Sequence, residues 1–260
     1  MSDPAALGAV GLAALDNFIG TFNSRNADAW AASLSYPHVR VSPRQAVAAV
    51  TPDERSYAAA TNYHAADAMG WDHSEWDAKT VLAVSDTKIH ASAQWCRFNA
   101  AGERILVNNV SYVITDVGGR WGIQARFGVD SPPPADPSGA IGRAEGAWER
   151  VLAAAGDGST AAATELVRLP FNIIEVGDIK VASNLEDVLA YLGNLAAGTG
   201  PQETVALQAG DMGVNLGVTL TGSGGSRRHA LVLVVLDEEG ARVSAASVID
   251  DAHLVSTRTS

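Results

Sequence analysis

The stretch VITDVGGRWGIQARF at residues 113–127 decides the fold, because it predicts two antiparallel strands joined by a turn. The strands are predicted over residues 103–116 and 120–129, and the glycines of Val117-Gly118-Gly119 suit a tight hairpin. A similar stretch, VVLDEEGARVSAASV, follows at residues 234–248, where Asp237 aligns with Asp116 at an offset of 121 residues. The hairpin therefore indicates that the chain contains one fold twice.

A second match and a linker support this repeat. SYPHV at residues 35–39 aligns with RLPFN at residues 168–172, so that Pro37 meets Pro170. Between the matched pairs lies SPPPADPSG, whose clustered prolines can continue neither a helix nor a central strand. We therefore predict a first domain over residues 1–130, a proline-rich linker over 131–139 and a second, degenerate domain over 140–255. Chance similarity of two α+β halves is the alternative.

Helices precede strands in the first domain. The hydrophobic pattern predicts helices over residues 6–22, 27–34 and 52–69, the last with Thr51 as its N-cap and Gly70 after its end. Two further strands are predicted over 74–85 and 88–99. Helices followed by a long curved antiparallel sheet make an α+β pattern.

Composition restricts the partners. The 260 residues are 47% apolar and 18% charged, as is typical of globular proteins. The formal net charge of −11 argues against nucleic acid and an anionic membrane surface as partners, because both would repel the chain. Met1-Ser2-Asp3-Pro4 lacks the positive start of a signal peptide, and the lone Cys96 forms no internal disulfide. We expect a cytoplasmic protein with a small-molecule substrate, and homo-oligomers are possible.

Five motifs resemble the NTF2-like, SnoaL-like superfamily over about residues 8–130. They are FNSRNADAW at 22–30, YPHVR at 36–40, GWDHSEWD at 70–77, KIHASAQWCRFNAAGE at 88–103 and GRWGIQARF at 119–127, and the last four look like one bacterial branch of it. The resemblance implies cone-shaped domains in which helices close one end of a curved sheet around a mostly apolar pocket. Two such domains in tandem would form a pseudodimer. This fold hosts isomerases, polyketide cyclases, dehydratases and non-catalytic binders, so the fold alone does not define the function.

The catalytic positions of family members carry other residue types here. Ketosteroid isomerase-like members have a tyrosine in the first helix where this chain has Phe18. Their general-base aspartate stands at the end of the first strand, where this chain has Val41 and Ser42. The resemblance therefore gives no support to steroid isomerisation by that mechanism.

The motif YPHVR at residues 36–40 offers another set of reactive groups. Tyr36, His38 and Arg40 alternate with Pro37 and Val39, so in an extended chain they project to one side. That side either lines a pocket or faces water. An imidazole beside a phenol is a usable acid–base pair, and we predict Tyr36 and His38 as catalytic residues.

The motif GWDHSEWD adds a histidine and two tryptophans. His73, beside Asp72, is either an oriented base or a solvent-exposed residue, and it joins the catalytic candidates. Trp71 and Trp76 either form pocket walls or attach the third helix to the sheet.

The later strands carry further polar residues. His90, Gln94, Gln124 and Arg126 are predicted on a polar face that is either the pocket floor or the contact with the second copy. In the repeat, His90 meets Asn215 and Arg126 meets Ser247, which places the reactive groups in the first copy. The predicted substrate-binding residues are Arg40, Trp71, Trp76, His90, Trp95, Arg97 and Arg126.

Two functions remain open. The first is a cofactor-independent enzyme that acts on a small apolar, aromatic or polycyclic substrate by elimination, isomerisation or cyclisation. His38 or His73 would move the proton, and Tyr36, with Arg97 or Arg126, would hold an oxyanion. The second is a non-catalytic small-molecule-binding or scaffolding protein. Neither HxH nor HExxH spacing occurs, so we expect no metal and no cofactor.

Overall fold

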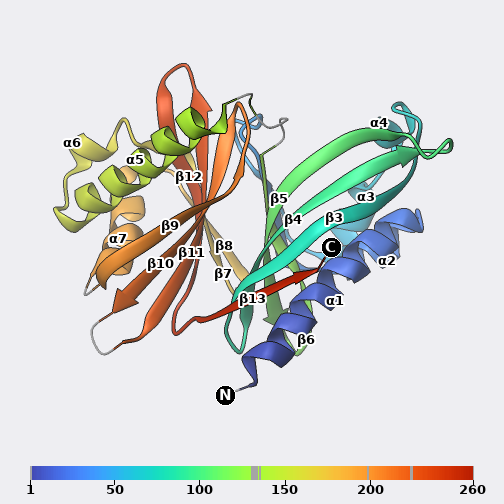
Figure 1. Ribbon diagram of the computed structural model, residues 1–260, viewed down its shortest axis with the longest axis horizontal. Coiled ribbons are helices and arrows are strands. Elements are labelled where there is room, and N and C mark those ends of the chain that lie inside the picture. Colours follow the sequence, from blue (N-terminus) through green and yellow to red (C-terminus); the bar gives the residue numbers. More distant parts are fainter. Residues whose placement is uncertain (1, 130–133, 135, 198, 223–224, 260) are drawn as a thin grey trace.

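Two layered domains stand side by side in the computed structural model, which describes residues 2–129, 134, 136–197, 199–222 and 225–259. The two sheets face each other in the middle through their outer faces, and the helices of each domain cover the opposite, inner face of its sheet (Figure 1). Residues 131–133 and 135 of the predicted linker lie outside the described residues, whereas residues 137–139 already belong to a helix.

The N-terminal domain begins with helices and ends with four consecutive antiparallel strands. Its elements are α1 (Pro4–Asn23), α2 (Ala27–Ala32), β1 (Leu34–Val41), β2 (Ala49–Thr51), α3 (Glu54–Ala60), α4 (His64–Asp67), β3 (Trp71–Val84), β4 (Lys88–Asn99), β5 (Arg104–Val117) and β6 (Arg120–Gly128). Gly118 and Gly119 both have positive φ angles, 66° and 83°, as a tight hairpin turn between β5 and β6 requires.

The C-terminal domain repeats this order. Its elements are α5 (Pro137–Gly156), α6 (Thr160–Ala163), β7 (Val167–Glu175), β8 (Asp178–Ala182), α7 (Leu185–Ala196), β9 (Thr199–Ala209), β10 (Gly213–Gly222), β11 (Arg227–Asp237), β12 (Gly240–Ile249) and β13 (His253–Thr259).

Strand order confirms the tandem repeat. The first sheet runs β13-β3-β4-β5-β6-β1-β2, and the second, taken from its other edge, runs β9-β10-β11-β12-β7-β8. Apart from β13, the two orders correspond strand for strand. In each sheet the first strand of the domain pairs in parallel with the last, β1 with β6 and β7 with β12. Both sheets are therefore mixed, and not wholly antiparallel as predicted.

Pairing corrects the alignment of the last hairpin by one residue. Val113 and Leu233 both lie in the apolar cluster between the domains and pair with His90 and Asn215 respectively, which supports the correspondence of His90 with Asn215. The offset of the fifth strand is then 120, not 121. Arg126 accordingly corresponds to Ala246 and not to Ser247. The alignment had matched Asp116 with Asp237, two acidic residues near the turns. That match is one residue out of register, and such a shift moves each side chain to the opposite face of the strand.

The predicted helix over residues 52–69 is two short helices. Asp53, and not Thr51, caps α3, because its carboxylate accepts a hydrogen bond from the backbone N–H of Ser56 at 2.7 Å. Thr61 is extended and ends α3, and the Asn62 side chain accepts from the N–H of His64 at 3.3 Å. Threonine and asparagine compete with helical hydrogen bonds through their side chains, which explains the break.

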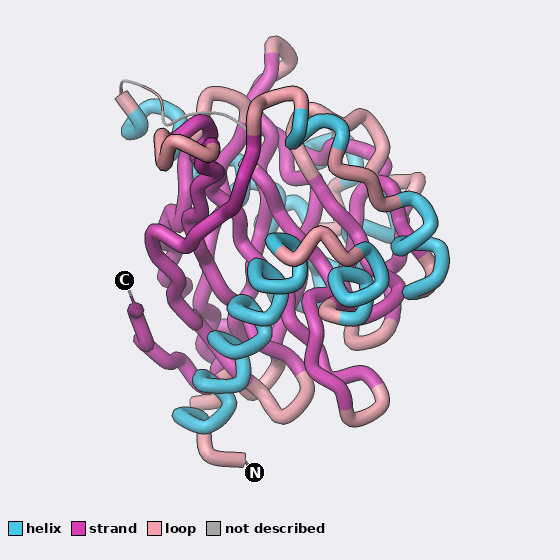
Figure 2. Tube along the Cα trace, turned by 90° about the vertical axis from the view of Figure 1, so that its right-hand side faces the viewer, coloured by secondary structure: helices cyan, strands magenta, loops and turns pink. Residues whose placement is uncertain are grey.

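Helix α1 packs across the inner face of the first sheet (Figure 2). Leu15, Phe18 and Phe22 on its buried face join the core of this domain. By length and composition α1 is the single helix among the described residues that could span a membrane. In this structure the apolar face of α1 packs in the hydrophobic core of the domain.

The domains meet through the outer faces of their sheets. Val39, Val113 and Phe127 of the first sheet form one apolar cluster with residues of the second, including Leu231 and Leu233. Polar bonds surround this cluster. For example, the buried Lys88 Nζ donates to the carbonyl oxygens of Ile174 and Val248 at 2.9 and 2.8 Å. The two domains thus form a pseudodimer within one chain.

Strand β13 crosses back to the first domain. It pairs antiparallel with β3, where His253 meets Val84 and Thr259 meets Lys79, and it lies beside α1 (Figure 1). The predicted second domain included residues 253–255, yet their backbone extends the first sheet. Sequence analysis missed this strand because a peripheral strand carries little periodic pattern.

Candidate functional site: a cavity with three arginines

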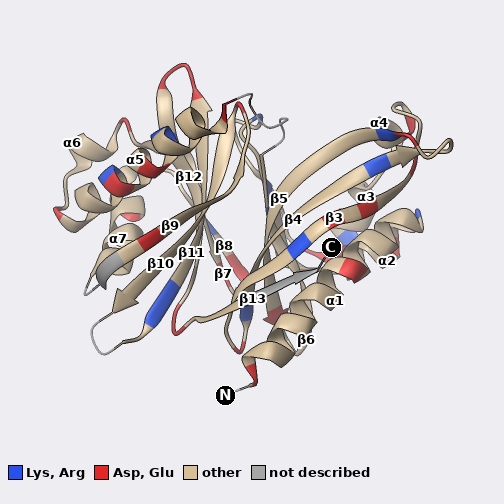
Figure 3. Cartoon of the chain, in the orientation of Figure 1, with Lys and Arg blue, Asp and Glu red and all other residues tan. Residues whose placement is uncertain are grey.

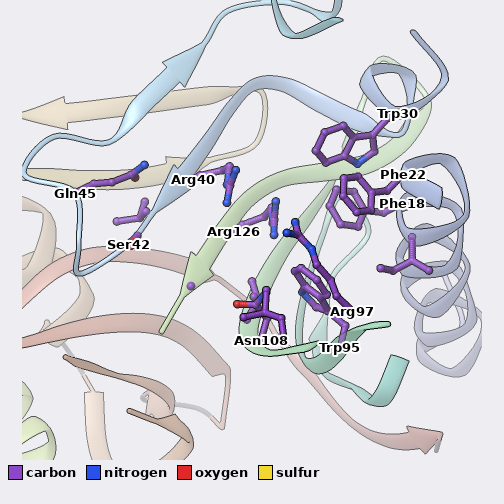
Figure 4. A pocket seen from close by; sticks show the side chains of 15 residues that line it. Phe18, Phe22, Trp30, Arg40, Ser42, Gln45, Trp95, Arg97, Asn108 and Arg126 are labelled. Atoms are coloured by element: carbon purple, nitrogen blue, oxygen red, sulfur yellow. The ribbon is translucent and has the colours of Figure 1, made fainter. Parts of the chain in front are cut away.

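A cavity of about 220 Å³ lies in the N-terminal domain between its helices and the inner face of its sheet. Fifteen residues line it, from α1, α2 and strands β1, β4, β5 and β6 and from the segment that follows β1. Figure 4 shows the aromatic side chains on the helical side and the arginines on the strands. The NTF2-like resemblance implied a mostly apolar pocket, whereas six of the fifteen described residues that line this cavity are polar or charged: Arg40, Ser42, Gln45, Arg97, Asn108 and Arg126.

The helical wall is aromatic. Phe18 and Phe22 are four residues apart on α1, so they lie one above the other on the same face of the helix. The ring of Trp30 from α2 packs on both, with ring centroids 5.7 Å from Phe18 and 4.7 Å from Phe22. Trp95 of β4 lines the strand side. The cavity is thus flanked by flat apolar surfaces.

Three arginines line the same cavity: Arg40 of β1, Arg97 of β4 and Arg126 of β6 (Figure 4). The Arg97 guanidinium carbon lies 5.6 Å from the ring centroid of Phe22 and 5.5 Å from that of Trp95. The Arg126 guanidinium carbon lies 5.1 Å from the Phe18 ring centroid. These cation–π contacts hold the two guanidinium groups against the aromatic wall.

A β-bulge explains why Arg126 faces the cavity. The β5–β6 register shifts between the pairs Val113–Ala125 and Ile114–Ile123, which leaves Gln124 as the extra residue. Ile123 lies in the inner core, whereas Ala125 belongs to the cluster between the domains. The bulge therefore puts Gln124 and Ala125 on the outer face and returns Arg126 to the inner one. Strict alternation had predicted Gln124 and Arg126 on one face, which is wrong.

His38 is buried beside the cavity but does not line it. Its Nδ1 lies 3.0 Å from the carbonyl oxygen of Ile123, in the interval where the β1–β6 register shifts. Nδ1 must therefore donate, and Nε2 is buried without a partner among the described residues. Burial is the largest effect on this imidazole, and together with the Arg126 and Arg40 charges it lowers the His38 pKa to about 3. The ring is neutral at neutral pH and closes a gap in the strand ladder.

Tyr36 and Trp71 also lie outside the cavity lining. The Tyr36 hydroxyl donates to the Ala31 carbonyl oxygen at 2.9 Å, and burial raises the pKa of this phenol. The Trp71 ring stacks on Tyr63 at 5.9 Å, and its Nε1 donates to Ser74 Oγ at 3.0 Å. Trp71 therefore attaches the segment around α4 to the sheet, which is the second of the two roles considered for it.

The three remaining candidates lie elsewhere. His73 stacks on Phe98 at 5.2 Å, and its Nδ1 lies 2.9 Å from the carboxylate of Asp72, outside the cavity. Trp76 packs edge-on against Tyr112 in the core, at 6.0 Å. His90 contacts the second domain, so its face is the domain contact and not the pocket floor. The structure thus brings Arg40, Trp95, Arg97 and Arg126 together and separates the other six.

Sequence analysis missed several lining residues, among them Phe22, Trp30, Gln45 and Asn108. The one signal in the sequence that could have located this wall is the set of positions at which other family members carry catalytic residues. Phe18, Val41 and Ser42, which stand where other members carry catalytic groups, all line the cavity. The described residues include no group of three or more His, Cys, Asp and Glu side chains placed to hold a metal ion.

Comparison with known proteins agrees with this architecture. Residues 12–129 match the family model described as NTF2-like protein (DUF6841). Similar solved structures include an NTF2-like protein of unknown function from Pseudomonas putida KT2440, with 11% identity over 52% of this chain and 93% of that one and a TM-score of 0.40. A Catenulispora acidiphila protein in complex with S-DNPA has 12% identity over 48% and 93%, with a TM-score of 0.39. Aln2 from a Streptomyces species has 16% identity over 50% and 93%, with a TM-score of 0.38.

No match was found among the curated proteins. The family match and the helices packed on a curved mixed sheet show that the first domain has the NTF2-like fold, and the strand order of the second domain repeats that fold. More particularly, the N-terminal domain matches the family DUF6841 over residues 12–129.

Proposed function

We propose that the N-terminal domain binds a small molecule with an aromatic or apolar body in this cavity, without acid–base catalysis. One observation carries the proposal. Of the fifteen described residues that line the cavity, none is His, Asp, Glu, Lys, Tyr or Cys, the side chains that usually serve as general acids and bases. The acid–base enzyme considered from the sequence needs such a group within reach of its substrate.

The family positions support the same conclusion. Phe18 and Val41 carry no ionisable group, and the Ser42 hydroxyl is by itself a weak base. Of the predicted catalytic residues, His38 lies within the electrostatic influence of the cavity residues Arg126 and Arg40, but its Nδ1 is used by the Ile123 carbonyl and its pKa is far below neutral. Binding without chemistry is therefore the function that the geometry supports best.

The size of the cavity limits the ligand. An engineered cavity of about 150 Å³ holds benzene, and this one has a volume of about 220 Å³. A single aromatic ring with one short substituent suits this volume. We also propose that the partner is a small molecule and not nucleic acid, since acidic residues are spread over both domains (Figure 3) and would repel nucleic acid. A cytoplasmic location is part of the same proposal.

A thermal-shift panel of phenol, toluene, benzamide and benzoate tests the proposal. We expect at least one compound to raise the melting temperature of the wild-type chain and to be recovered chemically unchanged. Leu106→Trp places an indole at the half-buried cavity wall and should abolish the shift, whereas Val107→Trp, on the exposed face of the same strand, should keep it. No stabilisation by any compound, a shift that survives Leu106→Trp, or conversion of the compound would contradict the proposal.

A further inference from the structure

The cavity wall is positively charged in an acidic protein. Its three arginines are the charged members of the fifteen described lining residues, while the whole chain carries a formal net charge of −11. Other arginines have acidic partners: Arg25 pairs with Asp67 and Arg104 with Asp77, each at 2.8 Å. For Arg97 and Arg126 the described residues provide no such ion pair.

The positive charges of Arg97 and Arg126 therefore lack a paired carboxylate among the described residues. Arg126 is only 6% exposed, and burial, together with the Arg126 charge, lowers the pKa of the neighbouring Arg97 guanidinium. Buried cations are costly unless an anion or hydrogen-bond acceptors compensate them. Cation–π attraction to the rings of Phe18, Phe22 and Trp95 offsets only part of the cost of burying the two guanidinium groups.

The two guanidinium groups also bring hydrogen-bond donors to the cavity wall, five N–H bonds each. The Tyr112 hydroxyl is a hydrogen-bond partner of Arg126, and one phenol oxygen cannot accept from five donors. Buried N–H groups in proteins are normally paired. A ligand with acceptor oxygens would match the two arginines in both charge and hydrogen bonding.

We propose, on the basis of the function proposed above, that the ligand is an aromatic carboxylate whose carboxyl group binds Arg97 and Arg126. The planar guanidinium groups suit the two oxygens of a carboxylate, which they bind in a forked geometry. The ring of the ligand lies against Phe18, Phe22 and Trp30. Arg40, the exposed arginine of the three, stands on the cavity wall where it attracts the anion.

The number of donors favours a carboxylate over a phosphate ester. The wall brings two guanidinium groups, Arg97 and Arg126, and a carboxylate presents two coplanar oxygens with one negative charge to them. A phosphate ester presents three oxygens and nearly two charges, which need more donors.

Titration calorimetry of the full chain with benzoate and benzamide, which have the same planar shape, tests the charge. We expect benzoate to bind at least about tenfold more tightly than benzamide, because charge-assisted hydrogen bonds are about twice as strong as neutral ones. Arg97→Gln and Arg126→Gln should each weaken benzoate at least about tenfold and leave benzamide within about twofold. Arg97→Lys should recover part of the loss. Arg104→Gln, at an arginine paired with Asp77 outside the cavity, is the matched control and should change neither ligand.

The outcomes separate the two proposals. Equal affinity for benzoate and benzamide, or benzoate binding that survives both arginine substitutions, overturns the carboxylate inference and leaves small-molecule binding intact. Tighter binding of phenyl phosphate than of benzoate also overturns it. If neither the neutral nor the charged compounds bind, the proposed function itself fails. Because Arg126 is buried, Arg97→Gln, at a more exposed position, gives the decisive variant if Arg126→Gln does not fold.

Discussion

His90 and His229 meet across the boundary between the two domains, with their Nδ1 atoms 2.8 Å apart. The His90 Nε2 lies 3.0 Å from the Ser247 hydroxyl, and both rings are buried. One Nδ1 must donate and the other accept, so at least one ring is neutral. Burial lowers the pKa of His229 to about 4, and burial, with the His229 and Lys88 charges, lowers that of His90 well below its ordinary value.

Acid should therefore weaken the packing of the domains. Below about pH 6.5 the unfolded chain protonates both histidines while the folded chain does not, so stability is lost as the pH falls from about 6.5 towards 4. For His229 the loss is on the order of 3 kcal/mol, given its pKa of about 4. Urea unfolding at about pH 7.5 and about pH 5 measures it. The double variant His90→Leu/His229→Leu should show a smaller pH difference, and an unchanged difference would refute this role. His73→Gln, at a solvent-accessible histidine, is the control.

Gly122 is required where β6 passes β1. A Cβ at this position would lie 2.6 Å from the carbonyl carbon of Leu34 and 2.8 Å from the backbone nitrogen of Ser35. Gly122→Ala should lower the free energy of unfolding by about 1–3 kcal/mol, as overpacking does. Gly20→Ala, at an exposed helical glycine with open space around it, should instead raise it by about 0.5–1 kcal/mol. Denaturant melts of the two variants that shift in the same direction would contradict this explanation.

Arg168 connects the second domain to the cavity. Its guanidinium donates to the carbonyl oxygens of Pro43 and Gln45 at 3.1 and 3.2 Å, and Gln45 lines the cavity. Arg168→Gln should reduce affinity for benzoate about fivefold, the equivalent of one hydrogen bond, although Arg168 lies outside the lining. The control Arg150→Gln removes an exposed arginine that bonds within α5. Equal affinities of the two variants for benzoate would show that the loop is held without Arg168.

β13 protects the edge of the first sheet. It pairs with β3 along residues 79–84, and an unpaired strand edge offers backbone groups to other chains. A chain stopped after Asp251 should melt at a lower temperature and associate with itself as concentration rises, which analytical ultracentrifugation detects. A truncated chain that remains monomeric and equally stable would show that β13 protects nothing.

Much of the fold could be predicted from local pattern. The strand over residues 88–99 has the predicted bounds, and the tandem arrangement follows from the repeated hairpin and the prolines of both first strands. Predictions were wrong where contacts distant in sequence control the geometry. The pairing of β13 and the register of the last hairpin are examples, since a local pattern does not specify the partner of a strand.

The candidate site could be predicted only in part. Arg97 and Trp95 were predicted as binding residues from the strand over residues 88–99 and its resemblance to the family. His38 was predicted as catalytic because an imidazole beside a phenol can act as an acid–base pair in water. Its burial and its bond to the Ile123 carbonyl depend on a register shift that no local signal announces.

The sequence by itself determined the order of helices and strands, because glycines, prolines and caps act within a few residues of their own position. It also determined that three arginines and several aromatic residues lie in the first domain. Only the tertiary structure decided which face of the sheet encloses the cavity. Both faces of this sheet are buried, one against helices and one against the second domain, so alternation does not distinguish inside from outside. The bulge at Gln124 then places Arg126 in the cavity with Arg97.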